Sequence, residues 1–257
     1  MTEILLETID LQKRFGALAV TSNLSLAVRR GETFGLIGPN GAGKTTLIGQ
    51  LTGEIAVDAG RIRFQGRDIT HLRTDERARL GLARTFQITS IFPSFSAEEN
   101  VALAVQATYP HSLKFWRPAS QIEELTQPAN RLLEMLGLGD RRDVNAAGMS
   151  HGEHRPLELA MALATRPSML LLDEPMAGLG TEESSHMTTL LKQLKKEFTI
   201  LLVEHDMDVV FSLADRIGVL VGGQLVALGS PDEIRRDSNV RAAYLGDENE
   251  AEGAFDA

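Results

Sequence analysis

Short apolar runs alternate with segments of helical period along most of this chain. Apolar and polar residues alternate from Ile4 to Phe15, and Leu24 to Val28 has a similar character, so both stretches are predicted strands. Thr33 to Ile37 is apolar enough for a buried strand. The segment from Thr46 to Thr52 that follows carries leucines four residues apart, which indicates one face of a helix.

The second half of the chain repeats this alternation. The stretch from Val101 to about Thr165 is mostly helical in pattern, with a proline-containing polar interruption near residues 109–118 and a stop at Gly137. Met169 to Leu172 and Thr199 to Val203 are predicted buried strands. Apolar runs on both sides of a Gly-Gly pair at 222–223 then predict a hairpin.

A glycine-rich turn lies between the Thr33–Ile37 strand and the next helix. It fits the pattern G-x-x-x-x-G-K-[ST] and consists of Gly38, Pro39, Asn40, Gly41, Ala42, Gly43, Lys44, Thr45 and Thr46. Backbone N–H groups and a helix N-terminus in this context form a cradle for phosphate. Lys44 is expected to reach the β- and γ-phosphates and the Thr45 hydroxyl to bind Mg²⁺. The alternative, a fortuitous turn with an exposed lysine, does not explain the strand and helix on either side, so we expect binding of a nucleoside triphosphate.

Two acids follow the apolar strand that ends at Leu172. Asp173 falls at the expected carboxyl edge of the sheet, where Mg²⁺ needs another oxygen ligand. Glu174 comes next and is placed to orient or deprotonate a water molecule. A structural alternative, in which Asp173 caps and Glu174 is solvated, exists for any Asp-Glu pair, but the phosphate cradle in the same chain favours the catalytic interpretation.

Composition narrows the possible classes of protein. The 257 residues are 43% hydrophobic, which suits a packed core, and the net charge of −9 argues against a protein that mainly binds nucleic acid. The absence of cysteine excludes disulfides and zinc–thiolate sites. The first residues show no secretory signal pattern and no apolar run is long enough to span a membrane, so a cytoplasmic protein is expected.

Together these motifs resemble the nucleotide-binding subunits of ABC transporters, and the resemblance extends to about Gly246. Gly38 to Thr46 is similar to the family's Walker A motif, and Met169 to Glu174 is similar to its Walker B motif. The remaining family positions fall on Phe15 (adenine stacking), Gln87 (Q-loop), His205 (switch histidine) and Met149-Ser150-His151-Gly152-Glu153 (signature). On the residues alone, Phe15 is equally compatible with stacking on a base and with a place in the core.

The resemblance implies a role for each of these residues. Glu174 and His205 are the expected catalytic residues, and Thr45, Gln87 and Asp173 the expected Mg²⁺ ligands. Two cassettes of the family close head to tail, so Ser150 and Gly152 of one chain are expected to face the ATP of the other. His151 and Glu153 depart from the common signature without removing the expected donors to phosphate. Gly180 stands at the position of the family's D-loop aspartate, so coupling between the cassettes there must use the backbone or another residue.

The resemblance also implies an α/β fold: a RecA-like P-loop core, an antiparallel β region and an inserted helical subdomain. We expect one ABC ATPase domain over residues 1–246, with the core in about 1–87 and 166–246 and the helical subdomain in about 88–165. Residues 247–257 form an acidic tail that is expected to be flexible.

The partners implied by the family are a second ATPase subunit, identical or paralogous, membrane-embedded permease subunits and, indirectly, a substrate-binding protein. No nucleic acid is expected. The chain is therefore expected at the inner face of the cell membrane, held there by the permease. The stretches 81–87, 203–207 and 244–246 are similar to subunits of branched-chain amino-acid importers, while Ser150-His151-Gly152 leans towards urea and short-amide importers.

Several alternatives remain open from the sequence. A soluble ABC ATPase acting on nucleic acid or ribosomes usually has two cassettes or a long coiled insert, which this chain lacks. A nucleotide-gated regulator without hydrolysis is suggested by Gly180, but Glu174 and His205 argue against it. His151 and His154 lack a third metal ligand, which favours a packing or solvated role. The segment from Ile88 to Asn100, with Ile91, Phe92, Phe95 and the following Val101, either docks a permease helix or packs under the helical subdomain.

Overall fold

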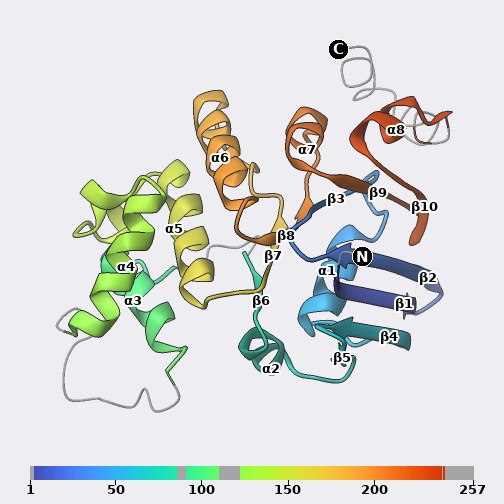
Figure 1. Ribbon diagram of the computed structural model, residues 1–257, viewed down its shortest axis with the longest axis horizontal. Helices are drawn as coiled ribbons and strands as arrows, with labels where there is room; N and C mark the ends of the chain where they lie inside the picture. Colours follow the sequence, from blue (N-terminus) through green and yellow to red (C-terminus); the bar gives the residue numbers. More distant parts are fainter. Residues whose placement is uncertain (1–2, 86–90, 110–121, 239, 241–257) are drawn as a thin grey trace.

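The computed structural model describes residues 3–85, 91–109, 122–238 and 240, and within them the chain forms two sheets surrounded by helices (Figure 1). The smaller, antiparallel sheet has the strand order β2-β1-β4-β5, and the larger has the order β10-β9-β3-β8-β7-β6. The strands are β1 (Ile4–Phe15), β2 (Leu18–Arg29), β3 (Thr33–Ile37), β4 (Ala59–Phe64), β5 (Arg67–Asp68), β6 (Leu82–Arg84), β7 (Met169–Asp173), β8 (Thr199–Val203), β9 (Arg216–Val221) and β10 (Gln224–Gly229).

The larger sheet is parallel except for its β9–β10 hairpin. All residues of β3, β7 and β8 are buried, as expected for central parallel strands covered on both faces. Because β3, β8 and β7 are adjacent and parallel, the loops that follow them meet at one edge. The predicted α/β fold, with its antiparallel region, its parallel core and the hairpin at Gly222-Gly223, is confirmed.

Helices and short turns lie between the strands in the described part of the chain. Those observed are α1 (Lys44–Thr52), α2 (Thr74–Arg79), α3 (Ala97–Gln106), α4 (Glu123–Met135), α5 (His151–Ala164), α6 (Thr181–Leu194), α7 (Met207–Leu213) and α8 (Pro231–Arg236), with 3₁₀ turns η2 (Gly139–Arg141) and η3 (Ala146–Gly148). In Figure 1, α3, α4 and α5 gather on the side of the larger sheet away from β1 and β2. Among the described residues, no helix is long and apolar enough to cross a membrane.

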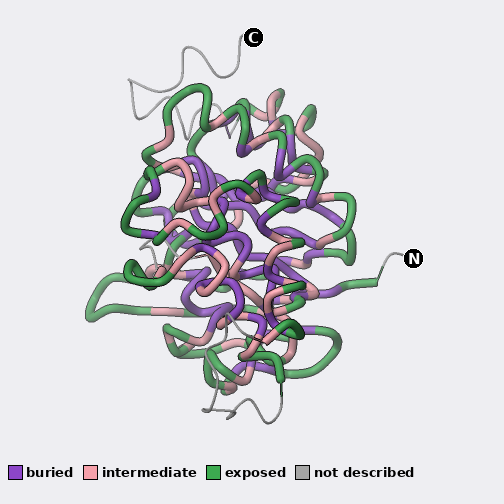
Figure 2. Tube along the Cα trace, turned by 90° about the vertical axis from the view of Figure 1, so that its left-hand side faces the viewer, coloured by how far each residue is buried: buried purple, intermediate pink, exposed green. Residues whose placement is uncertain are grey.

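Two large apolar clusters lie on opposite faces of the larger sheet at β7, and a smaller one covers β9. Met169 and Leu171 of β7 join the cluster that includes α1 and the antiparallel sheet, whereas Leu170 and Leu172 join the cluster that extends through α3 to α6. This alternation is the period of two expected of a strand. Figure 2 shows the buried segments concentrated between the layers. The helical region therefore shares its core with one face of the sheet, and the domain limits expected from the sequence stay a prediction.

A buried arginine fixes the helix that follows the glycine-rich turn. The Arg77 side chain of α2 donates hydrogen bonds to the carbonyl oxygens of Gln50, Leu51, Thr70 and Leu72 at 2.6–2.9 Å. Two of these carbonyls lie in the last turn of α1, which has no basic residue of its own there. A cation at this end compensates the negative end of the helix dipole and binds carbonyls of the last turn.

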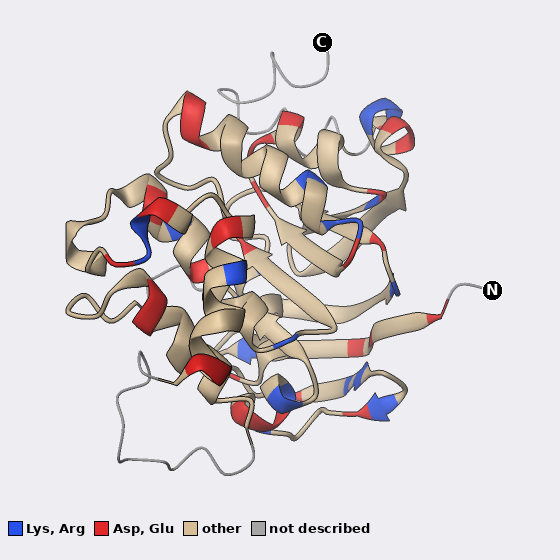
Figure 3. Ribbon diagram, turned by 60° about the vertical axis from the view of Figure 1, so that its left-hand side comes forward, with Lys and Arg blue, Asp and Glu red and all other residues tan. Residues whose placement is uncertain are grey.

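The charged residues are spread over both halves of the molecule. Figure 3 shows acidic and basic residues interspersed on helices, strands and connecting loops. Most of the ion pairs are exposed, such as Arg73 with Asp75 at 3.0 Å, and pairs of this kind add little stability. The pair between Arg84 and Asp173 is different, because the Asp173 side chain is only 1% exposed.

Candidate functional site

The glycine-rich turn lies between β3 and α1 and is held by backbone contacts. A side chain at Gly38 would place its Cβ 2.1 Å from the Leu220 carbonyl oxygen, and one at Gly43 would lie 2.5 Å from that of Val20. The φ angle of Gly43 is 103°, which L side chains rarely adopt. Gly41, by contrast, has open space around it. Glycine is thus required at position 43 because β2 approaches it closely. The motif alone did not show that β2 is its neighbour.

The first turn of α1 is suited to an anion. Its N-cap, Gly43, supplies no side-chain hydrogen bond, and the turn contains no acidic residue. No N-cap side chain binds the N–H groups at this end, and the positive end of the helix dipole lies behind them. Lys44 is buried, and its Nζ donates to the carbonyl oxygens of Gly38 at 2.5 Å and Pro39 at 3.1 Å, whereas Thr45 is exposed.

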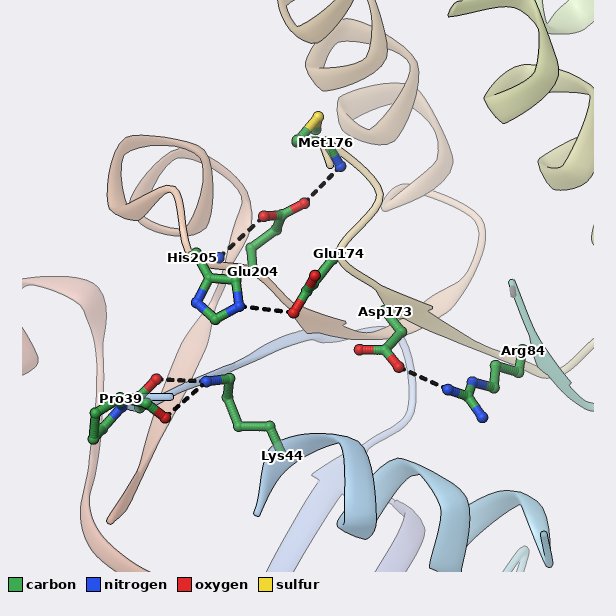
Figure 4. Close-up of polar contacts among 9 residues, drawn as sticks. Pro39, Lys44, Arg84, Asp173, Glu174, Met176, Glu204 and His205 are labelled. Atoms are coloured by element: carbon green, nitrogen blue, oxygen red, sulfur yellow. Dashed lines mark hydrogen bonds and ion pairs between the residues drawn. The ribbon is translucent and has the colours of Figure 1, made fainter. Parts of the chain in front are cut away.

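The two acids after β7 lie in different environments (Figure 4). Asp173 is buried, its Oδ2 accepts a hydrogen bond from Arg84 at 2.7 Å, and its Oδ1 has no hydrogen-bond partner among the described residues. Burial raises the pKa of Asp173 above its ordinary value, against the lowering effect of the Arg84 guanidinium. The next residue, Glu174, has a positive φ of 51°, an unfavourable conformation for a non-glycine residue.

Glu174 and His205 are brought together by the adjacent strands β7 and β8. Glu174 Oε1 lies 2.7 Å from His205 Nε2, and the Glu174 N–H donates to the Val203 carbonyl oxygen at 2.9 Å. The two side chains are 21% and 40% exposed, so solvent reaches the pair. Figure 4 shows this pair at the same sheet edge as Lys44 and Asp173.

Glu204 anchors the loops that carry this pair. It is buried, and its two carboxylate oxygens accept the backbone N–H groups of Met176 at 2.7 Å and of His205 at 3.0 Å. Burial raises the pKa of Glu204, although these two donors oppose the shift. Because Met176 follows Glu174 by two residues, one carboxylate joins the segment after β7 to the segment after β8.

Phe15 closes the turn between β1 and β2, where it pairs with Leu18. It is 52% exposed, and the Lys13 Nζ lies 5.4 Å from the centre of its ring. The core alternative for Phe15 is therefore wrong, and stacking on a base stays a prediction. Gln87, expected in the same site, lies outside the described residues.

The signature residues begin α5. Ser150 is the N-cap: its Oγ accepts from the Glu153 N–H at 3.2 Å, while Glu153 Oε2 accepts from the Ser150 N–H at 2.7 Å. Arg141 Nε lies 2.7 Å from the same carboxylate. Partial burial opposes ionisation, but the Ser150 N–H and Arg141 hold the pKa of Glu153 below its ordinary value. Glu153 thus occupies one donor that was expected to stay available for phosphate.

The segment before α6 packs against the signature. A Cβ on Gly152 would meet Glu183 Oε1 at 2.0 Å, and one on Gly178 would meet His151 Nε2 at 3.0 Å. Gly180 is the N-cap of α6, and its N–H donates to Glu183 Oε2 at 3.0 Å. These contacts place the signature beside the start of α6.

The segment proposed for docking divides into two parts, and residues 88–90 of it lie outside the described part of the chain. Ile91 is half-buried against the helical core and Val101 is fully buried, so for these two the packing alternative holds. Phe92 and Phe95 are 50% and 38% exposed, with ring centres 5.5 Å apart. The buried Asn100 side chain holds the loop by donating to three carbonyls, including those of Phe92 and Phe95.

The paired histidines have packing contacts. His154 Nε2 lies 2.8 Å from the Ala146 carbonyl oxygen, and its ring meets that of His151 edge to face. No group of three or more histidine, aspartate or glutamate side chains that could hold a metal was found in the described chain. The predicted Asp173 site does not depend on such a group, because a metal there would also use a hydroxyl and phosphate oxygens.

Sequence reasoning missed three contributors to this region. The Ser150-x-x-Glu153 capping box has a local signal, since serine followed three residues later by glutamate is its pattern. Arg84 and Glu204 have none, because their partners lie 89 and 28 positions away along the chain.

Comparison with known proteins gives a consistent result. Residues 21–177 match the family described as ABC transporter, and residues 224–250 match the family described as branched-chain amino acid ATP-binding cassette transporter. The high-affinity branched-chain amino acid transport ATP-binding protein LivG of Salmonella typhimurium is 38% identical, over 96% of this chain and all of LivG. BraF of Pseudomonas aeruginosa, with the same description, is 37% identical over the same shares.

Solved structures agree with these relatives. An ATP-binding cassette of an ABC transporter in its ADP conformation has a TM-score of 0.84 and 31% identity, over 95% of this chain and all of that one. A nucleotide-free ATP-binding cassette from an ABC transporter has a TM-score of 0.82 and 31% identity, over 94% and 98%. With its fold, its phosphate-binding turn and these relatives in agreement, the chain belongs to the ABC transporter family, as an ATP-binding subunit that hydrolyses ATP.

Proposed function

We propose that this chain is the Mg²⁺-dependent ATPase subunit of an importer of branched-chain amino acids. It would act as a dimer, with itself or with a paralogue, held at the inner face of the cell membrane by permease subunits. The match of residues 224–250 and the names of the relatives LivG and BraF support the cargo. The observation that carries the chemistry is the 2.7 Å contact of Glu174 with His205 at the sheet edge beside Lys44.

Each residue of the site has its own role in the hydrolysis of ATP. The N–H groups at the start of α1 and the Lys44 ammonium bind the ATP phosphates. Glu174 accepts the proton of the attacking water, and His205, in contact with it, orients that water and the γ-phosphate. Phe15 stacks on the adenine. Ser150 and Gly152 of the partner cassette complete the site.

A metal fits the residues present. Asp173 offers a buried oxygen, Oδ1, with no hydrogen-bond partner in the described chain, and Thr45 offers an exposed hydroxyl at the first turn of α1. Hard oxygen donors of this kind suit Mg²⁺. Asp173 and Thr45 would hold the ion together with Gln87. Bound there, Mg²⁺ would neutralise negative charge on the phosphate oxygens.

The permease is proposed to dock where Phe92 and Phe95 are exposed. Asn100 holds both residues in a fixed loop, so the aromatic surface is preorganised for a partner. Phe92→Ala and Phe95→Asp are expected to weaken co-purification with the permease and leave turnover by the free chain unchanged. Met135→Ala, at another exposed apolar residue, is the matched control. Unchanged complex formation and uptake with both phenylalanine variants would place the docking surface elsewhere.

The cargo is tested by reconstitution. The chain is combined in liposomes with candidate permease subunits, and ATP turnover is measured with binding proteins carrying leucine or urea. Stimulation by the leucine-loaded protein supports the proposal. Stimulation by the urea-loaded protein alone would assign the chain to the urea and short-amide importers.

A further inference from the structure

Arg84 links two acidic residues that lie far apart along the chain. Arg84 is the last residue of β6, and it pairs with Leu171 of the parallel strand β7. Its guanidinium donates through Nη2 to Asp173 Oδ2 at 2.7 Å and through Nη1 to Glu54 Oε2 at 2.5 Å. Glu54 follows α1, so one planar side chain connects β6, β7 and the segment after α1. Figure 4 shows the Asp173 end of this link.

The two ends of this link differ in exposure. The side chains of Asp173 and Arg84 are 1% and 11% exposed, whereas Glu54 is 38% exposed. Glu54 and Arg84 also line a cavity of about 250 Å³ between α2 and α5. The outer end can therefore be altered without opening the core, which makes the role of the link testable one end at a time.

The hydrogen bond from Arg84 fixes the orientation of the Asp173 carboxylate. With Oδ2 bound to Arg84, the carboxylate cannot rotate freely, and Oδ1 is the oxygen left without a hydrogen-bond partner in the described residues. A lysine could not reproduce this arrangement, because only a guanidinium offers separate donors in a rigid plane for two carboxylates.

We infer that Arg84, held by Glu54, is a positioning residue that orients Asp173 for the metal ion accompanying ATP. This inference rests on the Mg²⁺ site proposed above. Residues that orient a metal ligand are commonly worth about 10- to 100-fold in metal affinity. Arg84 therefore acts on the metal through Asp173 and touches neither ATP nor the ion.

The experiment measures metal and nucleotide binding separately. Mn²⁺ serves as the probe, and its binding to the purified chain with ATP is followed by electron paramagnetic resonance. Arg84→Met is expected to weaken Mn²⁺ binding by about tenfold or more. ATP affinity in EDTA should stay within about twofold, because Arg84 lies outside the phosphate cradle. Arg84→Lys should fall between Arg84→Met and wild type, and Glu54→Gln should show a smaller loss in the same direction.

Arg79→Met is the matched control, since Arg79 is an arginine with a 75% exposed side chain that pairs with Asp75 on α2. It should bind Mn²⁺ like the wild type. Equal Mn²⁺ affinity in wild type and in folded Arg84→Met would overturn the inference and leave the metal site standing. If Arg84→Met does not fold, wild-type affinity in both Arg84→Lys and Glu54→Gln has the same meaning. A wild type that binds ATP but shows no ATP-dependent Mn²⁺ binding would instead remove the proposed metal site.

Discussion

The two parts of this protein that carry ATP-related motifs are built differently. The nucleotide edge, formed where β3, β7 and β8 end, buries Lys44, Asp173 and Glu204 and holds each with protein atoms. The residues of the signature edge, 150–153 and 177–180, are exposed or half-buried, and its polar groups bind mainly one another.

This difference in burial and hydrogen bonding indicates which part of the reaction each edge can perform alone. Buried groups with fixed partners are preorganised, and preorganised dipoles account for a large part of enzymatic rate enhancement. An exposed, self-capped helix start binds phosphate only after another molecule has excluded water. We therefore expect substitutions at the nucleotide edge to affect the chemistry directly, and those at the signature edge to act through assembly.

The largest effect is expected at Glu174. Glu174→Gln keeps the shape of the side chain and removes the proton acceptor, so ATP turnover should fall by at least about 100-fold, the lower range for general base catalysis. ATP binding should persist. Phosphate release and nucleotide binding by the same preparation provide the measurement. Turnover within about twofold of wild type, a minor change in barrier, would show that another residue is the base.

Mixing two inactive variants tests whether the edges are shared between chains. Lys44→Ala removes the lysine of the cradle, and Ser150→Arg blocks the signature, so each alone should be inactive. A heterodimer of the two has one site with both lesions and one intact site, and turnover should return on mixing. The measurement is phosphate release at several mixing ratios. Absence of recovery, with heterodimers demonstrated by cross-linking, would contradict head-to-tail sharing.

A smaller effect is expected at Glu204. In Glu204→Gln the amide can accept only one of the two N–H groups, and hydrogen bonds to a charged group contribute about 1.5–3 kcal/mol. If roughly half of that is felt in the transition state, turnover falls by about 3- to 12-fold, while the KM for ATP stays within about twofold.

The control for Glu204 is Glu32→Gln. Glu32 is also buried, accepts a backbone N–H from Arg29 and pairs with Arg216, but it lies before β3 at the opposite end of the sheet. It should lower thermal stability and leave turnover unchanged. Equal losses of turnover in both variants would mean that Glu204 has only a structural role.

The smallest effect is expected at Glu153, on the signature edge. Glu153→Gln keeps an acceptor for the Ser150 N–H and removes a negative charge from the helix start. The KM for ATP should fall about two- to fivefold, since an exposed charge contributes about 1 kcal/mol at close range in water. Glu182→Gln, in the exposed first turn of α6, is the control. A KM that rises in Glu153→Gln would show that the carboxylate supports the site.

Most of the fold follows from local pattern, and the exceptions are short. β1, β3, β7, β8 and the β9–β10 hairpin lie close to their predicted limits, because each has an apolar period or a turn signal of its own. β6 has only three residues, Leu82–Arg84, and no period can be read over that length. Val101 has the same apolar character as the exposed Phe92 and Phe95, and only the packing of α3 against α4 and α5 decides that it is buried.

Local motifs identify the phosphate-binding turn and the acids after β7, because ATP hydrolysis uses these residue types at short, fixed spacings, and the resemblance to ABC transporters identifies the histidine after β8. The contacts that hold these residues in place become visible only in the folded chain. Arg84 reaches Asp173 across 89 positions, and Glu204 reaches the Met176 N–H across 28. Such contacts depend on which strands become neighbours in the sheet, and strand order is a property of the whole chain that no local spacing encodes.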